Sequence, residues 1–318
     1  SVNTLIVNGG GIMAFYPSQL DFEYINPYMQ PDMLGDIVSG CHARGIHVLT
    51  RFDFSRIHES IFESHPDWAY LSPAGERIRN DDMYVTSVNA PYVQEKCMEI
   101  IREVMTLYPI DGIFINMPGY ATRNAYEGVY HGIDQNPHDA ARFAAFSGGL
   151  ALPKEEDRDD PVFQKYLEFK AYTVEDWGQR IHETVKAMNP DAAICTYTDR
   201  YVDIMRHETQ SGEPPYWPYA ASENVNSVTH TYPELVVSNA SIQQLSFQSR
   251  YNAAEPPETV IRLWQNLANG SGLDMSLMGD FRGYEDQRSF PAWERIYGFH
   301  KRHEPYFGNY RSVAEILV

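Results

Sequence analysis

The feature that most constrains the fold is an amphipathic helix followed directly by a short apolar strand. Val93, Cys97 and Ile100 recur at helical spacing in residues 91–108, which predicts a helix that covers one side of a sheet. Residues 110–116 then form an apolar run between two turn-forming segments, as expected of a strand buried on both faces. A helix that leads into a buried strand is the repeating unit of parallel α/β folds, in which the chemistry lies where strands end.

Eight segments read as strands, and a helical pattern stands between most of them. They are residues 4–8, 47–52, 84–87, 110–116, 192–197, 202–206, 236–247 and 273–279. The third is weak, and the link between the fifth and the sixth is too short for a helix. Since strands that alternate with helices pair in parallel through right-handed crossovers, eight of them predict an α/β fold closed into a (β/α)8 TIM barrel with long βα loops. We expect the 318 residues to form one such domain.

The charge balance limits the kinds of partner. The net charge is −18, from 43 acidic and 25 basic residues, so the field of the protein repels nucleic acids and anionic membranes. The 22 tyrosines and five tryptophans suit a neutral polyhydroxylated ligand, although an acidic surface kept for solubility explains the composition equally well. We therefore expect a carbohydrate as the partner, and neither nucleic acid nor membrane.

The cysteines and the ends of the chain give little information about function or compartment. Cys41, Cys97 and Cys195 lie in apolar patterns without metal-like spacing and are expected to be core residues. No run of about 18 apolar residues predicts a membrane span, and the first residues lead into a strand without a signal sequence. The compartment stays open, with the cytoplasm slightly favoured.

Five segments carry a family resemblance. In chain order they are NGGGIMAFYPS, RFDFSRIHESIFESHPDWAY, IDGIFINMPGY, VDIMRHET and WQNLANGSGLDMSLMGDF. Together they resemble the barrel of hypothetical glycosyl hydrolase family 6, a group related to the barrels of family 42 β-galactosidases and family 29 fucosidases. The resemblance covers nearly the whole chain and implies a (β/α)8 fold that hydrolyses glycosides. The C-terminal EPYFGNYRSVAEILV resembles the exit toward a β-galactosidase-type trimerisation domain, which implies a homotrimer of the full-length protein.

Glu208 is the first candidate for catalysis. Glycosidic bond cleavage generally uses two carboxyl groups, one as an acid and one as a nucleophile or base. Arg206 stands two residues before Glu208 and is expected on the same face of the strand. An apolar strand that ends in Arg206, His207 and Glu208 is costly unless these charges are used. The alternative is an Arg–Glu pair that only closes the rim of the barrel. The resemblance implies the catalytic assignment, because the R-x-E element belongs to the group's pattern.

The second carboxyl group is left open between Asp53 and Asp280. Each follows a predicted strand, and Asp53 could instead hold a ligand or cap the next helix. Asn116 ends the fourth strand, where fucosidase-like barrels have an Asp nucleophile and family 42 barrels have Asn followed by the acid/base Glu. Since Met117 follows Asn116 here, neither assignment carries over. We expect Asn116 to bind a sugar hydroxyl or to position the attacking water.

Further ligand-binding candidates fall into two groups. Tyr16, Trp68, Tyr120 and Tyr197 could stack on sugar faces, although an aromatic residue in a long loop more often packs that loop. The polar candidates for hydroxyl or carboxylate groups are Arg51, His58, Asn89, Arg206 and Arg250.

No cofactor or metal is expected. The segment 131–143 contains two His and two Asp, but the spacing matches no standard metal site, so we expect a solvated loop there. The glycines at 9–11 are not followed by a phosphate-binding Lys. The sequence thus predicts a glycoside hydrolase that acts on an oligosaccharide or a small glycoside. The alternatives are a non-catalytic carbohydrate-binding barrel and a metal-dependent sugar isomerase or hydrolase on the same fold.

Overall fold

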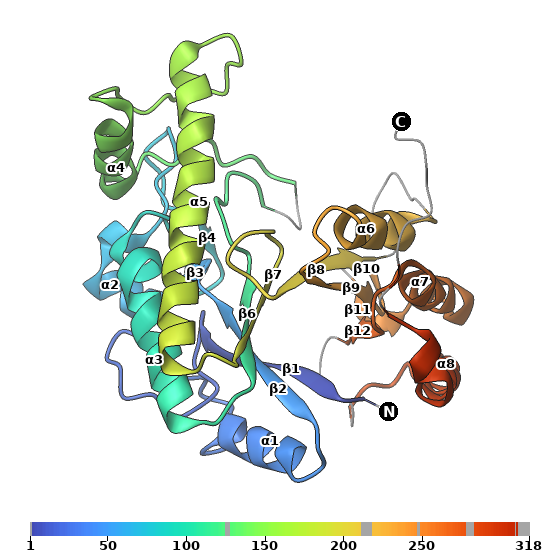
Figure 1. Cartoon of the computed structure of the whole chain (residues 1–318). Coiled ribbons are helices and arrows are strands. Elements are labelled where there is room, and N and C mark those ends of the chain that lie inside the picture. The colour runs from blue at the N-terminus through green and yellow to red at the C-terminus, as the bar shows by residue number, and fades with distance from the viewer. Residues whose placement is uncertain are drawn as a thin grey trace. The chain divides into compact units, whose positions relative to one another are not determined.

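The chain divides into two compact units. The computed structural model describes residues 2–124, 128–210, 218–246, 249–277, 283–308 and 310. Residues 3–194 form the N-terminal unit, coloured blue to yellow-green in Figure 1, and residues 195–318 with the first two residues form the C-terminal unit. Strand β7 (Ala193–Thr196) is divided between them.

The N-terminal unit has helices packed on parallel strands in the order β1-β2-β6-β7. Its other elements are β1 (Thr4–Gly11), α1 (Met33–His42), β2 (His47–Asp53), β3 (Arg56–His58), α2 (Glu59–Ser64), β4 (Arg79–Asn80), β5 (Met83–Val85), a π-helical turn (Tyr92–Lys96), α3 (Cys97–Leu107), β6 (Gly112–Asn116), α4 (Pro137–Ser147) and α5 (Pro161–Met188). β1 pairs in parallel with β2, and β2 with β6. The long α5 runs beside α3 and α4 (Figure 1).

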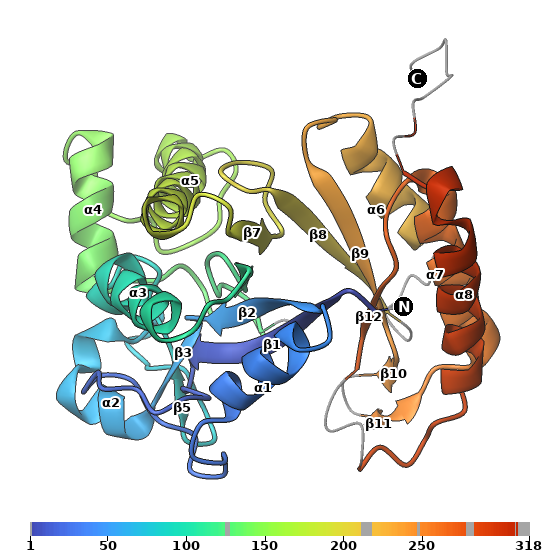
Figure 2. The same ribbon diagram turned by 60° about the horizontal axis from the view of Figure 1, so that its bottom comes forward.

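The C-terminal unit continues the α/β pattern with parallel strands in the order β7-β8-β9-β12. Its elements are β8 (Ile204–Thr209), α6 (Ala220–Thr229), β9 (Val236–Ile242), β10 (Gln244–Ser246), β11 (Ser249–Ala253), α7 (Pro256–Asn269), β12 (Asp274–Ser276), α8 (Phe290–His303) and a 3₁₀ turn (Glu304–Tyr306). Helices α6, α7 and α8 lie together along one side of these strands (Figure 2). Leu263, Leu267 and Trp293 form the core between α7 and α8.

The predicted helix and strand at 91–116 are confirmed. Ile100 and Val104 of α3 are fully buried, and Ile113, Phe114 and Ile115 of β6 are buried as well. The strand is therefore covered on both faces, as the apolar run required.

The predicted third barrel strand is wrong. Residues 83–85 form β5, the middle strand of a separate antiparallel sheet with the order β3-β5-β4. β4 and β5 are joined by a tight turn in which Asp81 has a φ of 54°, so this segment pairs with its neighbours in sequence. Seven of the eight predicted strands thus occur in the parallel order. Among the described residues the parallel order has seven strands, and closure into an eight-stranded barrel stays a prediction.

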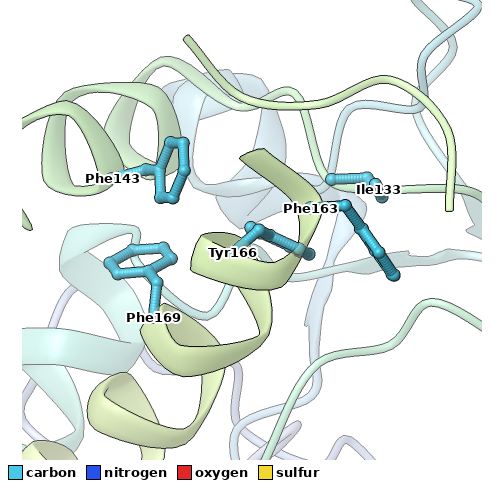
Figure 3. Packing of buried hydrophobic residues seen from close by; sticks show 5 residues of the cluster. All are labelled: Ile133, Phe143, Phe163, Tyr166 and Phe169. Carbon is cyan, nitrogen blue, oxygen red and sulfur yellow. The ribbon is translucent and has the colours of Figure 1, made fainter. Parts of the chain in front are cut away.

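The expected solvated loop at 131–143 is also wrong. Ile133, Asp134 and Asn136 are fully buried, and Asp139 on α4 is buried too. Ile133 packs in an aromatic cluster with Phe143, Phe163, Tyr166 and Phe169, in which the rings of α4 and α5 lie against one another (Figure 3). Apolar residues at two ends of a polar segment therefore draw that segment into the core.

The glycines at 9–11 permit a close approach of β1 to β2. A Cβ atom on Gly9 would lie 2.0 Å from Cγ2 of Thr50, and one on Gly11 would lie 2.2 Å from the carbonyl oxygen of Asp53. Gly11 also has a φ of 103°, which L-residues rarely adopt. The triple glycine thus has a packing role at the end of β1.

Asp111 joins the beginnings of β2 and β6. Its carboxylate accepts a hydrogen bond of 2.7 Å from the Val48 amide and lies 2.8 Å from both the His42 and the His47 rings. Burial alone would raise the pKa of this carboxyl group, but the bonds from His47, Val48 and His42 hold it below its ordinary value. The Asp111 carboxylate therefore stabilises the folded chain where it is ionised.

Replacing Asp111 tests this contribution. We expect Asp111→Asn to lower the free energy of unfolding by about 1–2 kcal/mol at pH 7. Because the folded pKa lies below the unfolded one, the stabilisation is complete above a pH of about 4 and is lost as the pH falls through the folded pKa. Urea denaturation of both proteins at pH 7 and pH 3 measures this. The exposed Asp21→Asn is the control, and an Asp111→Asn deficit that stays constant at low pH would contradict the assignment.

Candidate active-site residues at the strand ends

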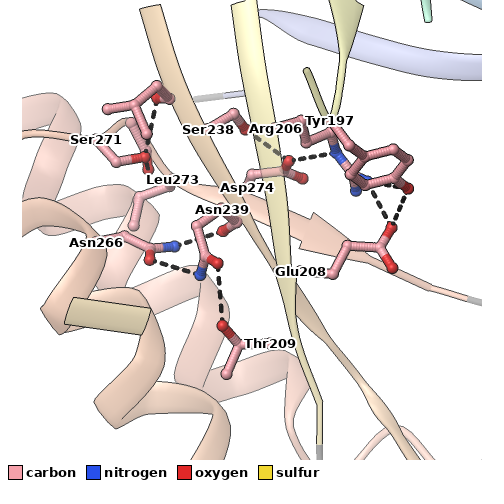
Figure 4. Close-up of polar contacts among 12 residues, drawn as sticks. Tyr197, Arg206, Glu208, Thr209, Ser238, Asn239, Asn266, Ser271, Leu273 and Asp274 are labelled. Carbon is pink, nitrogen blue, oxygen red and sulfur yellow. Dashed lines mark hydrogen bonds and ion pairs between the residues drawn. The ribbon is translucent and has the colours of Figure 1, made fainter. Parts of the chain in front are cut away.

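Glu208 lies on β8 with one carboxylate oxygen fixed and the other available. Tyr197 donates its hydroxyl to Oε1 at 2.8 Å, and Nη1 of Arg206 donates to the same atom at 2.6 Å (Figure 4). Oε2 has no hydrogen-bond partner in the described parts of the chain. The side chain is 34% exposed, so a ligand can reach it. The expectation that Arg206 and Glu208 share a face of this strand is confirmed.

Arg206 is buried between two carboxylates. Its Nε donates to Oδ2 of Asp274 at 3.0 Å, and Ser238 donates its hydroxyl to the same oxygen at 2.7 Å (Figure 4). Burial alone would lower the pKa of the guanidinium, but the carboxylates of Asp274 and Glu208 more than offset burial and raise it. Arg206 is therefore held as a cation, and it orients Glu208.

Asp274 was not among the residues selected from the sequence. Glu208 pairs with Ala240 in the β8–β9 register, and Asp274 pairs with Ala240 in the β9–β12 register. Asp274 thus lies level with Glu208 two strands away, although it is the first residue of β12. Asp274 begins its strand, and the stagger that brings it level with Glu208 has no signal in the local sequence.

On the face of β8 and β9 that packs against α6 and α7, side chains hold the backbone around Glu208. Thr209 donates to the Asn239 side chain at 3.0 Å, and Asn239 donates to Asn266 of α7 at 2.9 Å (Figure 4). Asn224 of α6 donates to the carbonyl oxygen of Glu208 at 3.3 Å. Arg262, also buried, donates to the carbonyl oxygen of Thr209 at 3.3 Å. The peptide groups that carry Glu208 are therefore anchored by both helices.

Asp53 forms a second polar cluster, at the end of β2 in the N-terminal unit. Arg51 and Asn116 each donate to Oδ2 at 2.8 Å, and Ser55 donates to Oδ1 through its hydroxyl at 2.6 Å and its amide at 3.1 Å. Arg51 also reaches the Asn8 side chain at 3.3 Å. Asp53 is 4% exposed and accepts four hydrogen bonds, so this arrangement suits a residue that orients Arg51 and Asn116.

Two aromatic candidates pack inside the N-terminal unit and offer no free face to a sugar. Tyr16 is fully buried and donates its hydroxyl to Glu103 at 2.7 Å. Trp68 is 4% exposed, with the His65 ring stacked 3.9 Å away and the Tyr92 ring nearby. Packing of the loop, the alternative considered for such residues, replaces the expected stacking role.

Polar candidates in the same unit also have local partners. His58 caps α2 through the Ser60 amide, and its ring stacks on Tyr24 at 3.6 Å. Asn89 donates to the Tyr120 hydroxyl at 2.9 Å and to the carboxyl group of Asp139 at 2.6 Å. The Asn89 contacts link the segments after β5 and β6. Direct ligand contact by His58, Asn89 and Tyr120 stays a prediction.

Two candidates of the C-terminal unit are less defined. Arg250 lies on β11, which pairs antiparallel with β10, and its contact with a ligand stays a prediction. Asp280 lies outside the described residues.

Glu23 is a buried carboxyl group that the sequence reading did not single out. It accepts a hydrogen bond of 2.8 Å from the Gly11 amide at the end of β1 and is 5% exposed. Burial raises the pKa of Glu23 to about 8, so the group is mostly protonated at neutral pH. Only a structure could reveal it, because the surrounding segment resembles an irregular loop.

In the part of the chain that the structure describes, no three His, Cys, Asp or Glu side chains are placed to hold a metal ion. The carboxyl groups of the 131–143 segment have protein partners instead. Asp139 accepts from the Ser87 hydroxyl at 2.6 Å, and Asp134 accepts from the Leu71 amide at 3.0 Å. Burial and the proximity of Asp134 raise the pKa of Asp139 well above its ordinary value. Across the same described residues, no helix has the length and apolar character needed to cross a bilayer.

Comparison with known proteins supports a glycosidase-like fold. Residues 1–117 match the model of the family described as hypothetical glycosyl hydrolase 6. No curated protein sequence matches the chain.

Solved structures match nearly the whole chain. An α-L-fucosidase, isoenzyme 2, from Paenibacillus thiaminolyticus is 17% identical with a TM-score of 0.71, over 97% of this chain and 45% of that one. The β-galactosidase from Rahnella sp. R3 is 14% identical with a TM-score of 0.67, over 96% of this chain and 52% of that one. The β-galactosidase from Bacillus circulans sp. alkalophilus is 12% identical with a TM-score of 0.67, over 92% of this chain and 51% of that one.

The chain spans about half the length of these solved structures. The resemblance to glycoside hydrolase barrels expected from the sequence is confirmed. Residues 1–117 are similar to hypothetical glycosyl hydrolase family 6, and the chain as a whole shares the α/β fold of fucosidases and β-galactosidases of known structure.

Proposed function

We propose that this protein is a glycoside hydrolase in which Glu208 acts as the acid/base. The observation that carries the proposal is the Glu208 carboxyl group: Arg206 and Tyr197 hold Oε1, Oε2 has no partner among the described residues, and the side chain is 34% exposed. A carboxyl group fixed in this way can present one oxygen to a glycosidic oxygen and transfer a proton along a defined direction. The glycosidase-like fold adds the context in which such a group acts on sugars.

The second carboxyl group is assigned to Asp53 or Asp280. All four hydrogen bonds of Asp53 would have to loosen before it attacked a sugar carbon, which favours an orienting role for Asp53 and the catalytic role for Asp280. Asn116, bonded to Asp53, is then suited to bind a sugar hydroxyl. The 318 residues are proposed to form a (β/α)8 barrel, and the full-length protein is proposed to form a homotrimer through a C-terminal domain.

A panel of aryl glycosides tests the reaction. We expect at least one neutral aryl glycoside to be hydrolysed, with the configuration of the first product seen by NMR deciding between retention and inversion. EDTA should leave the rate unchanged, because the proposed reaction uses only carboxyl groups. A metal-dependent rate would favour the isomerase or hydrolase alternative.

A non-catalytic carbohydrate-binding barrel is the second candidate. It is favoured by Asn116 and Met117, which leave the end of β6 without a carboxylate. Binding of a sugar in calorimetry without hydrolysis of any panel member would support this function and contradict the enzyme.

A further inference from the structure

The site on β8 contains more negative than positive charge. Glu208 and Asp274 are both ion-paired to Arg206, at 2.6 and 3.0 Å, and neither has another cationic partner among the described ion pairs. Two carboxylates therefore share a single guanidinium. Arg206 is 6% exposed in its side chain, so solvent screens the cluster weakly.

Asp274 is placed to determine this balance. It belongs to β12 and is level with Glu208 across β9, and the Ser238 hydroxyl fixes the oxygen that contacts Arg206. An arginine without such a partner would present its planar fork to a ligand carboxylate, the geometry that guanidinium groups recognise best. Here Nε is bonded to Asp274 and Nη1 to Glu208. Asp274 thus occupies the Nε edge of Arg206 and places a second negative charge close to Glu208.

We propose that Asp274 is a specificity-determining residue that excludes ligands with a carboxylate group, such as uronides, from the site beside Glu208. The inference rests on the proposed function, since it concerns the substrate bound next to the acid/base. Asp274 acts through Arg206 and through its own charge. Removal of the Asp274 carboxylate leaves the Glu208 carboxylate paired with the Arg206 guanidinium. This neutral pair does not repel an anion.

Asp274→Asn tests this role through the ratio of kcat/KM values for two substrates that differ in charge. The two substrates are the neutral aryl glycoside hydrolysed fastest in the panel and its analogue with a carboxylate at C6. We expect Asp274→Asn to raise the kcat/KM for the anionic analogue relative to the neutral one by about tenfold or more, because one full charge close to the ligand is removed. Added salt should weaken the discrimination of the unmodified protein.

Two controls separate charge from structure. Ser238→Ala removes the hydroxyl that holds Asp274 but keeps the carboxylate, so the ratio should stay near that of the unmodified protein. Glu255→Gln removes one carboxylate from another arginine pair of the same unit, Glu255–Arg288 at 2.7 Å, and should leave the ratio unchanged.

Several outcomes would overturn the proposal. An unchanged ratio in a folded Asp274→Asn protein contradicts it, as does an unmodified protein that prefers the anionic analogue. Loss of all neutral turnover in Asp274→Asn would make Asp274 catalytic instead. If the unmodified protein hydrolyses neither substrate, the proposed function fails, and calorimetric binding of galactose against galacturonate tests the inference alone. Equal affinities, or tighter galacturonate, would then reject it.

Discussion

Glu208→Gln is expected to lower kcat/KM by about 10²–10⁴-fold on the best aryl glycoside, because the amide cannot exchange a proton with the leaving oxygen. The replacement has nearly the same shape and can still accept from Arg206 and Tyr197, so the midpoint of thermal unfolding should change little. Steady-state release of the aryl group measures the rate, and calorimetry measures the unfolding.

The matched control is Glu255→Gln, the same change at an exposed glutamate of the C-terminal unit. It should retain full activity. Near-normal activity of Glu208→Gln would remove Glu208 from the mechanism. An unfolded Glu208→Gln would show instead that its pair with Arg206 is structural, which was the alternative considered for this motif.

Gly11→Ala is expected to destabilise the N-terminal unit by about 3 kcal/mol or more, combining backbone strain of about 1–2 and overpacking of about 1–3 kcal/mol. The added Cβ would lie 2.2 Å from the carbonyl oxygen of Asp53 at a φ of 103°. Since the obstacle is backbone, the end of β2 must move, and the hydrogen bonds of Asp53 with it. Urea denaturation followed by tryptophan fluorescence measures the loss.

Gly45→Ala separates the two causes. Gly45 has a φ of 68°, but a Cβ there meets no atom within 4 Å. The control should therefore cost only the strain, about 1 kcal/mol. Equal losses in the two variants would contradict the close approach of β1 to β2.

The sequence predicted those parts of the fold in which one periodicity determines burial. The α3–β6 unit was predicted because its apolar positions follow a helix and then a strand. The same reasoning placed Glu208 and Arg206 on one face, since alternate residues of a strand point the same way. Residues 83–85 also form a strand, but whether a strand joins the parallel sheet or a local hairpin depends on its partners, and the turn at Asp81 decided this.

Other parts of the candidate site depend on register and on long-range packing. Asp274 contacts Arg206 because β12 is staggered against β8, and no local pattern contains that stagger. Asp139 is buried because α5 covers it from a distant part of the chain, although its own segment is polar. Glu23 has its raised pKa because the fold buries it against Gly11 of β1 and against Tyr92, both distant in the sequence. In each case the property depends on contacts between residues that lie far apart in the sequence.

The amide network behind β8 has a consequence for redesign. Asn224 and Arg262 hold the peptide oxygens of Glu208 and Thr209 from the helix side, independently of the side chains on the opposite face. Residues on that opposite face can therefore be exchanged while the strand keeps its place. A library built on these positions should yield proteins with altered ligand preference at an unchanged melting temperature.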